Sequence, residues 1–286
     1  SNKGAVMLRI LKGIYLEKDY PGVYLGGVVG ADESEAVLID APLREEEARG
    51  WLETVGEKGE PRYAILLDSH PDRALGLRHY GLPIVAHEIT SAEMAAWPDT
   101  FKGDARQVGG ESDSLKRVTE VSESVPEVIF RDRMTIDLPD RPIHLLHQPG
   151  PTPGATWVEV PDKATVFIGD AVTVKEPPYV GKADIDAWLD SLDVLRDSPF
   201  EEYKIISSRD GLVERDDIND MARFLRKIPV RLERLEERDV PEEAVRSIAE
   251  ELIEDFNVIK ARRELALARL EQGLLRLFRE EEPEED

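Results

Sequence analysis

Apolar and polar positions along the first two hundred or so residues follow two alternating patterns. Short apolar runs bounded by glycine, proline or acidic residues predict buried strands, whereas apolar residues three and four positions apart predict helices. Strands are expected at Leu8–Leu16, Val23–Val29, Val37–Asp40, Tyr63–Leu67, Ile84–Ala86, Glu127–Phe130, Met134–Asp137, Ile143–His147, Trp157–Val160, Val166–Ile168 and Lys204–Ser207. Helices are expected at Arg44–Val55 and Asp184–Leu195, with a surface loop or helix-and-loop insertion at residues 97–125. This alternation predicts an α/β (layered α+β) protein.

The pattern changes after Gly211. A helix capped by Asp216 or Asp217 is expected first, and apolar residues then recur at helical spacing beyond Pro241. These later residues are Val245, Ile248, Leu252, Ile259, Leu267, Leu270, Leu274 and Leu277. We therefore expect one domain at residues 1–213 and a C-terminal helical extension at residues 214–286.

The apolar stripe beyond Pro241 also bears on assembly. A continuous helix of about 35–40 residues would extend about 55 Å, which is longer than a core of this size can cover. An uncovered apolar face of that kind marks an interface. We therefore expect a homodimer through this helix. The alternative is that Gly273 or a break near Asn257 folds the helix back onto its own domain.

Composition and charge narrow the range of partners. The 286 residues include no cysteine, which excludes disulfides and thiolate-bound zinc and fits a reducing compartment. With 37 basic and 60 acidic residues the net charge is −23, which repels nucleic acid and anionic membrane surfaces. The chain has no apolar run long enough to span a bilayer, and its N-terminus has no secretory pattern. We expect a cytoplasmic protein without nucleic-acid or membrane partners.

The most informative segment lies directly after a predicted strand. It reads Asp68-Ser69-His70-Pro71-Asp72-Arg73 and is followed by Gly76. It resembles the His-x-His-x-Asp-His loop of the metallo-β-lactamase superfamily, which holds two metal ions. His70 and Asp72 match that motif, and Asp68 replaces a histidine with another possible metal ligand. Arg73 cannot coordinate a metal, because a guanidinium has no free lone pair.

Four further segments extend the resemblance in the same order. They are Val37–Asp40 with Ala41-Pro42, Gly150–Gly154, Val166–Asp170 and Ile206–Gly211. Pro151 and Asp210 stand where the family has metal-binding histidines, while Asp170 matches the aspartate that bridges both metals. The resemblance covers about residues 8–213. It implies an αββα sandwich of two mixed sheets, and a hydrolase of a small ester, thioester or phosphoester that uses metal-activated water.

The resemblance also implies a site. The metal ligands would be Asp68, His70, Asp72, Asp170 and Asp210, converging in one cleft, with Asp72 as the catalytic residue. Arg73 and Pro151 each remove one nitrogen ligand from the two metal positions. We therefore expect no ordinary two-zinc centre.

Two alternatives remain open for this site. In the first, the carboxylates hold one divalent cation, for which Mg²⁺, Mn²⁺ or Ca²⁺ would suit an oxygen-rich cluster better than Zn²⁺, and the protein hydrolyses a small-molecule substrate. In the second, no metal is bound. Arg73, assisted by Arg209, then acts as a substitute cation that pairs with the carboxylates, and the protein is a non-catalytic scaffold or binding protein.

Overall fold

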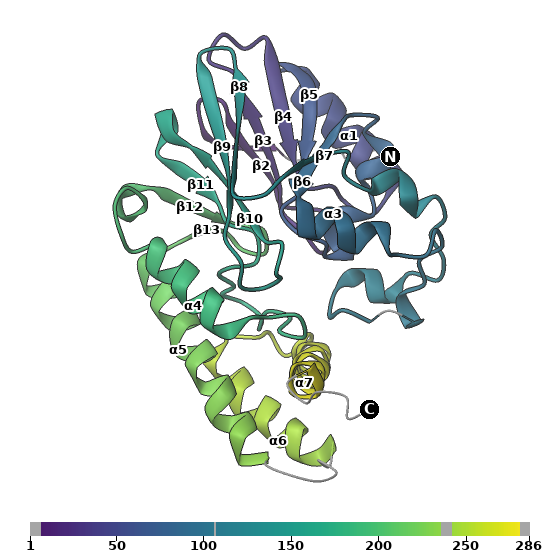
Figure 1. Ribbon diagram of the computed structural model, residues 1–286, viewed down its shortest axis with the longest axis vertical. Helices are drawn as coiled ribbons and strands as arrows, with labels where there is room; N and C mark the ends of the chain where they lie inside the picture. Colours follow the sequence, from purple (N-terminus) through teal and green to yellow (C-terminus); the bar gives the residue numbers. More distant parts are fainter. Residues whose placement is uncertain (1–6, 106, 236–241, 281–286) are drawn as a thin grey trace.

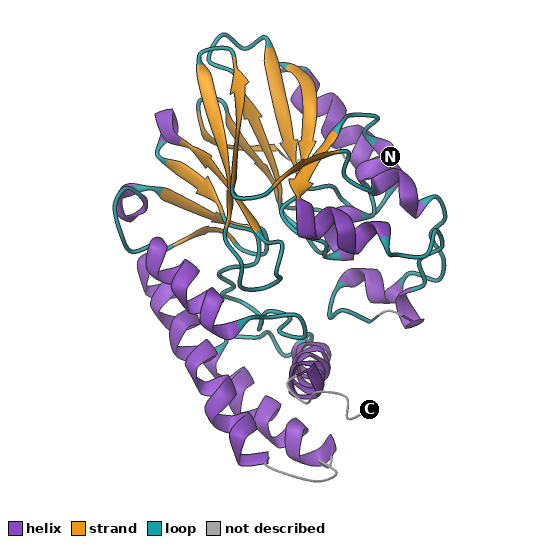
Figure 2. Ribbon diagram, in the orientation of Figure 1, coloured by secondary structure: helices purple, strands orange, loops and turns teal. Residues whose placement is uncertain are grey.

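The computed structural model describes residues 7–105, 107–235 and 242–280. Two β-sheets pack face to face with helices on their outer sides (Figures 1 and 2). The first sheet has seven strands in sequence order, from β1 to β7. These are β1 (Met7–Leu11), β2 (Ile14–Glu17), β3 (Leu25–Val29), β4 (Glu35–Ile39), β5 (Glu60–Ile65), β6 (Ile84–His87) and β7 (Val128–Phe130). Helices α1 (Glu45–Gly56) and α3 (Glu88–Ala95) lie outside it.

The second sheet has six strands in the order β13-β12-β11-β10-β9-β8. These are β8 (Arg133–Leu138), β9 (Arg141–His147), β10 (Thr156–Val160), β11 (Thr165–Phe167), β12 (Lys204–Ser207) and β13 (Gly211–Val213). Buried residues of both sheets, such as Val28, Ile39 and Val158, form one core between them. Gly26 lets the sheets approach closely, because a Cβ there would lie 2.7 Å from the ring of Phe167. The predicted αββα sandwich is confirmed.

One strand prediction was wrong. The run Leu8–Leu16 forms two antiparallel strands, β1 and β2, and its polar centre is the turn between them. Gly13 has a φ of 83° in this turn, a conformation that favours glycine over other residues. The apolar residues on both sides resemble a single strand in the sequence, because a tight hairpin interrupts the pattern for only two residues.

The segment at residues 97–125 is an insertion of short 3₁₀ helices and loops. This agrees with the second of the two expectations, a helix-and-loop insertion. Its 3₁₀ helices are η2 (Gly103–Ala105), η3 (Glu111–Ser114) and η4 (Val121–Ser124). Phe101 and Val118 pair through an isolated β-bridge that closes its base. The insertion carries Glu111 toward the strand ends where the site lies.

Two of the later helices pack on the outer face of the second sheet (Figure 1). Helices α4 (Ile185–Val194) and α5 (Arg215–Leu232) share a core with strand residues such as Val166 and Ile205. Helix α5 starts two residues after β13 ends, although the division into two domains at residue 213 stays a prediction. Its N-cap is Glu214, in a capping box with Asp217, so the expectation of a cap at Asp216 or Asp217 was wrong. Among the described helices, none is long and apolar enough to cross a membrane.

The apolar stripe beyond residue 241 belongs to two helices rather than one. Helix α6 (Glu242–Leu252) is followed by η8 (Ile253–Asp255), and α7 (Arg263–Glu280) folds back against α6. Phe256, which packs edge-on against Phe224 of α5 at 5.0 Å, anchors the reversal. Pro241 itself lies outside the described residues.

The reversal covers most of the stripe from within the chain. Leu267, Leu270, Leu274 and Leu277 of α7 are all buried in the shared core. The prediction of one continuous helix was therefore wrong, and its alternative, a break near Asn257 that folds the helix back, is what the structure has. The uncovered face from which the homodimer was argued is absent from the described part of α7. The homodimer stays a prediction, but it has lost this argument.

Candidate functional site

Four strand ends meet at one edge of the sandwich. Asp40 follows β4, and its backbone N–H bonds Ile65 O at the end of β5, at 2.8 Å. Asp170 follows β11 and Arg209 follows β12, and Ser208 N bonds Gly169 O at 2.9 Å. Because these parallel strand pairs finish together, side chains distant in sequence are brought within contact of one another.

The guanidinium of Arg73 lies at the centre of this edge. Arg73 lies in the short helix α2 (Pro71–Ala74), which begins within the motif loop, and its side chain is fully buried. It bonds Asp170 through Nη2, and its Nε and Nη1 lie 3.3 Å from Asp68 and 3.6 Å from Asp40. Burial alone would lower the pKa of Arg73, but these carboxylates raise it, so the group stays charged.

A glycine makes room for this guanidinium. Gly169 has a φ of 60°, and a Cβ there would lie only 3.2 Å from Nη1 of Arg73. The left-handed turn between β11 and Asp170 therefore serves two purposes. It aims Asp170 into the site, and it leaves the space in which the arginine head group lies.

A second guanidinium, that of Arg209, faces the first across Asp170. Its Nε and Nη2 donate to the two carboxylate oxygens of Asp170 at 2.9 and 3.0 Å. Its Nη1 donates to the carbonyl of Gly22 and to Asp72 at 3.2 Å. Burial would lower the pKa of Arg209, and Asp170 and Asp72 raise it instead.

The two guanidiniums determine the charge state of the carboxylates. Burial alone would raise the pKa of Asp170, yet Arg209 and Arg73 hold it well below its usual range. Burial also acts to raise the pKa of Asp72, but His70, Arg209 and two backbone N–H groups lower it to about 2. Both carboxylates are therefore ionised at neutral pH.

Asp72 and His70 are closed in by the insertion. The carboxylate of Asp72 accepts from Glu111 N at 3.0 Å and from Ser112 N at 2.8 Å. Gly110 has to be a glycine for this contact, because a Cβ there would lie 2.5 Å from both Asp72 and His70. The insertion therefore binds Asp72 directly through its backbone.

Both nitrogens of His70 are engaged. Nδ1 accepts from the backbone N–H of Asp72 at 3.1 Å and thereby caps α2. Nε2 lies 3.2 Å from the carbonyl of Val108, to which it donates as the protonated nitrogen of this tautomer. Burial lowers the pKa of His70, so the ring is neutral at neutral pH and has no free lone pair.

Asp40 is a site residue whose role the sequence did not reveal. It is fully buried with a φ of 61°, and it accepts from Leu67 N at 3.0 Å. Burial raises its pKa to about 7, although Arg73 acts in the opposite direction. Asp40 therefore titrates near neutrality beside the Arg73 guanidinium. Its place at the end of the matched segment Val37–Asp40 was the sequence signal for it.

The structure brings Asp68, His70, Asp72 and Asp170 together, as the resemblance implies, and it directs Asp210 elsewhere. The carboxylate of Asp210 accepts from Val174 N at 2.7 Å and lies 3.6 Å from Lys175 Nζ. In the part of the chain that the structure describes, no three histidine or acidic side chains are grouped as metal ligands.

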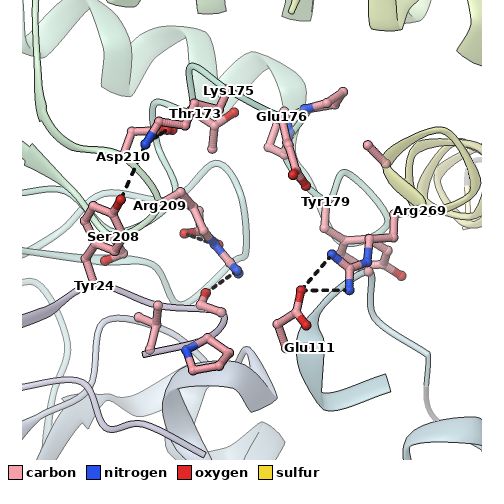
Figure 3. Close-up of a pocket in the computed structure, with 18 of the residues that line it drawn as sticks. Tyr24, Glu111, Thr173, Lys175, Glu176, Tyr179, Ser208, Arg209, Asp210 and Arg269 are labelled. Atoms are coloured by element: carbon pink, nitrogen blue, oxygen red, sulfur yellow. Dashed lines mark hydrogen bonds and ion pairs between the residues drawn. The ribbon is translucent and has the colours of Figure 1, made fainter. Parts of the chain in front are cut away.

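An open cavity of about 380 Å³ lies beside this cluster. Figure 3 shows Arg209 on one side of it and Arg269, from α7, on the other. Its lining comes from the loop before β3, the insertion, the segment after β11, the turn between β12 and β13, and α7 with the residue before it. The lining residues are Tyr20, Pro21, Gly22, Val23, Tyr24, Gly109, Glu111, Asp170, Thr173, Lys175, Glu176, Pro177, Pro178, Tyr179, Ser208, Arg209, Asp210, Arg262, Ala266 and Arg269.

The contribution of α7 and of the turn before it, which carries Arg262, was not foreseen. Arg262 and Arg269 are on the polar side of an amphipathic pattern, which in sequence is typical of a solvated helix face. In the structure they meet Glu111 of the insertion, at 3.2 and 3.3 Å. The folding back of α7 places these arginines over the cavity.

Comparisons with known proteins agree with this architecture. The sequence profile described as the metallo-beta-lactamase superfamily matches residues 22–204. A metallo-beta-lactamase from Pontibacter korlensis superimposes with a TM-score of 0.60 at 17% identity, covering 78% of this chain and 99% of its own. A metallo-beta-lactamase family protein from Thermus thermophilus gives 0.63 at 20% identity, covering 96% and 95%.

A double mutant of a sec-alkyl sulfatase gives a TM-score of 0.67 at 15% identity, covering 96% of this chain and 50% of its own. No curated protein matches the chain. At these identities the similarity shows the fold. The coverage by the Thermus thermophilus protein extends into the C-terminal helices as well as the sandwich.

Proposed function

This chain belongs to the metallo-β-lactamase superfamily, and on that basis we propose that it is a metal-independent protein that binds a small molecule beside the former metal site. Two arginines take the place of the metal ions in this proposal. The chain keeps the fold and the cleft, and it uses them for binding rather than for hydrolysis.

The observation that carries the proposal is the pairing of Arg73 and Arg209 with the site carboxylates. Arg73 bonds Asp170 and lies near Asp68, while Arg209 bonds Asp170 with two nitrogens and Asp72 with the third. Removing either cation would leave buried carboxylates unpaired, which is strongly unfavourable. A divalent cation would have to displace both guanidiniums from their partners.

The other candidate metal ligands support the same conclusion. The lone pair of His70 Nδ1 is occupied by Asp72 N–H, and Asp72 itself accepts three hydrogen bonds. Asp210 pairs with Lys175, away from the cluster, and Pro151 has no ligand atom in its side chain. The residues present do not fit a resident metal ion.

The hydrolase implied by the family is the competing function. It would need Asp72 as a catalytic residue and a metal-activated water, acting on a small ester, thioester or phosphoester. In this chain Asp72 is fully buried and is bound by two backbone N–H groups and Arg209. Such a group holds the insertion in place rather than contacting a substrate.

The experiment is a hydrolysis assay of the full chain with nitrophenyl acetate, nitrophenyl phosphate and a thioester. Each substrate is tested with EDTA and with added Zn²⁺, Mn²⁺ or Mg²⁺. We expect the turnover of the wild type to be no higher than that of the Arg73→Met variant under any of these conditions. Turnover that appears with one metal, disappears with EDTA and is lost in Asp72→Asn would overturn the proposal in favour of the hydrolase.

A further inference from the structure

Two histidine rings stack where the two sheets meet. His87 ends β6 of the first sheet and His147 ends β9 of the second, and their ring centres lie 3.8 Å apart with the planes inclined by 16°. We propose that this stacked pair is a proton-sensitive switch, which holds the N-terminus of helix α3 while His87 is neutral and releases it when both rings are protonated. The proposal goes beyond the proposed function and does not depend on it, because both rings lie outside the cluster around Arg73 and Arg209.

The ring of His87 caps α3 from within the core. Its Nδ1 accepts from Ile89 N at 3.2 Å and so satisfies one of the free N–H groups at the start of the helix. The residue is 1% exposed, and Phe130 packs edge-on against the ring at 5.5 Å. Because Nδ1 accepts a hydrogen bond, the neutral ring carries its proton on Nε2, and a second proton has to bind at Nδ1. Protonation of His87 therefore removes the acceptor that caps the helix.

The ring of His147 is the more open of the two. The residue is partly exposed, and its Nε2 lies 2.8 Å from Pro153 O, to which only a protonated nitrogen donates. Nδ1 then carries a lone pair that makes no hydrogen bond within the described residues. The first proton from solvent therefore forms an N–H bond at Nδ1 of His147, and the contact with Pro153 is kept.

The second proton has to bind His87, and the closed stack opposes it. Burial is the largest cause that lowers the pKa of His87, and the neighbouring His147 ring lowers it further, because two positive rings in contact repel each other. An exposed histidine has a pKa of about 6.5. Below about pH 6.5, His87 therefore binds a proton more readily in the released state than in the closed one, and acidification favours release.

The charges around the stacked pair reduce this effect without cancelling it. Among the described residues they are Glu88 at the start of α3, and Arg131 and Asp132 after β7. Glu88 and Asp132 raise the pKa of His87, as does the backbone of Arg131, but the pKa stays below its ordinary value. The carboxylate of Glu88 is also engaged, since Arg131 donates to its two oxygens at 2.8 and 3.1 Å.

Helix α3 connects the stacked pair to two loops of the site. Thr90 Oγ1 donates to Gly154 O at 3.0 Å, and a Cβ at Gly154 would lie only 2.3 Å from that hydroxyl. One turn further along, Glu93 accepts from Ser69 of the motif loop and pairs with Lys182. The loop that carries Gly154 has no ionisable side chain of its own between residues 148 and 154. Release of the first turn of α3 therefore loosens this loop and the support of the motif loop together.

Hydrogen exchange of the full chain, at about pH 7.5 and about pH 5.5, measures the release. Dividing each rate by the intrinsic rate of the unfolded sequence at the same pH gives the opening equilibrium. About one unit below the pKa of an exposed histidine, linkage favours the open state by about 10-fold. We expect an increase of that size in α3 and in the loop that carries Gly154. Helix α1, which has no side-chain cap, reports changes of the whole fold and should not show it.

Three variants assign the response to the stacked pair. His87→Asn keeps an acceptor suited to a helix N-cap and does not titrate, so the increase in α3 should disappear. His144→Asn is the control, because His144 is on the same strand as His147 and contacts Thr135 instead. We expect α3 of this control to open like that of the wild type. His147→Gln keeps a donor for Pro153 O and should reduce the increase without abolishing it, because burial lowers the pKa of His87 more than His147 does.

The ring signals of the wild type give a second measurement, which decides the matter even if a variant does not fold. The chain has five histidines, so their ring signals can be followed one by one in an NMR titration. We expect the ring of His87 to stay neutral at pH values where an exposed histidine is already charged. A His87 ring that titrates near pH 6.5, equal responses of α1 and α3, no response of α3, an increase that persists in His87→Asn, or an undiminished one in His147→Gln would overturn the proposal.

Discussion

Arg209 and Asp170 meet side by side, with Nε of the arginine 2.9 Å from one carboxylate oxygen and Nη2 3.0 Å from the other. The first of these oxygens also accepts from Arg73. One carboxylate thus holds two guanidiniums, which in turn reach Asp68 and Asp72. The planar fork of arginine fits this geometry, and a lysine ammonium does not.

The first prediction follows from this fork. Arg209→Lys keeps the charge and loses the paired hydrogen bonds, so we expect the free energy of unfolding to fall by about 1–3 kcal/mol. Arg209→Ala, which leaves Asp170 and Asp72 short of a buried partner, should cost about 3–5 kcal/mol. Denaturant unfolding measures both. Arg223→Ala is the control, because Arg223 is exposed and pairs with Asp220 on the surface.

A second prediction concerns Arg73. Arg73→Met keeps much of the volume and removes the charge, so Asp40, Asp68 and Asp170 would be left close together without their common partner. We expect a loss of about 3–5 kcal/mol in the free energy of unfolding. The double variant Arg73→Met with Asp170→Asn should recover part of it, because one of the repelling charges is gone. A double variant whose loss equals the sum of the two single losses would mean that the two residues do not interact.

A third prediction concerns pH and Asp40. Its pKa is about 7 in the folded protein, whereas it is near 4 in an unfolded chain. Between about pH 4 and pH 7 the carboxyl group of Asp40 is therefore protonated in the folded protein and ionised in the unfolded chain. The stabilisation from Asp40 is complete below about pH 4, is lost as pH rises toward 7, and changes no further at higher pH.

Asp40→Asn removes this dependence. The free energy of unfolding of the wild type should fall relative to that of Asp40→Asn by an amount on the order of 4 kcal/mol between pH 4 and 7. The lowered pKa of His70 acts in the opposite direction over part of this range, but it does so in both proteins and cancels in the difference. Parallel curves for the two proteins would show that Asp40 does not titrate in this window.

A fourth prediction concerns the attachment of α7. Glu111→Gln removes the charge that holds Arg262 and Arg269, at 3.2 and 3.3 Å. These side chains are partly exposed, so the loss of stability should be small, about 0.5–1 kcal/mol. Hydrogen exchange of the backbone in α7 should nevertheless become faster. Glu88→Gln, which breaks a pair with Arg131 far from α7, should leave exchange in α7 unchanged.

Much of the fold could be predicted from the sequence because strand periodicity and motif order carry that information locally. The segments that end at Asp40, Asp170 and Gly211 lie at one edge of the sandwich, although they come from two sheets, as their order in the family implies. The prediction of one long C-terminal helix was wrong for a physical reason. Its apolar spacing continues across residues 253–262, but the chain there follows the packing of Phe256 against Phe224. The break near Asn257, considered from the sequence as the alternative, is where the chain reverses, between α6 and α7.

The site was predicted in part. Asp68, His70, Asp72, Arg73 and Asp170 were identified because they occupy motif positions. Asp210 was also a motif position, but its carboxylate is turned toward Lys175 and the cluster is completed by its neighbour Arg209. Side-chain direction at a turn depends on backbone angles that the sequence alone does not reveal.

The central claim is that Arg73 and Arg209 replace metal ions, and the metal content of the protein tests it most directly. The full chain, purified without chelators from medium supplemented with zinc and manganese, is measured by plasma emission spectroscopy. The arrangement of the two guanidiniums predicts far less than one ion of any divalent metal per chain, and no change in melting temperature on adding EDTA. A stoichiometric metal ion that EDTA removes, together with a fall in melting temperature, would contradict the claim.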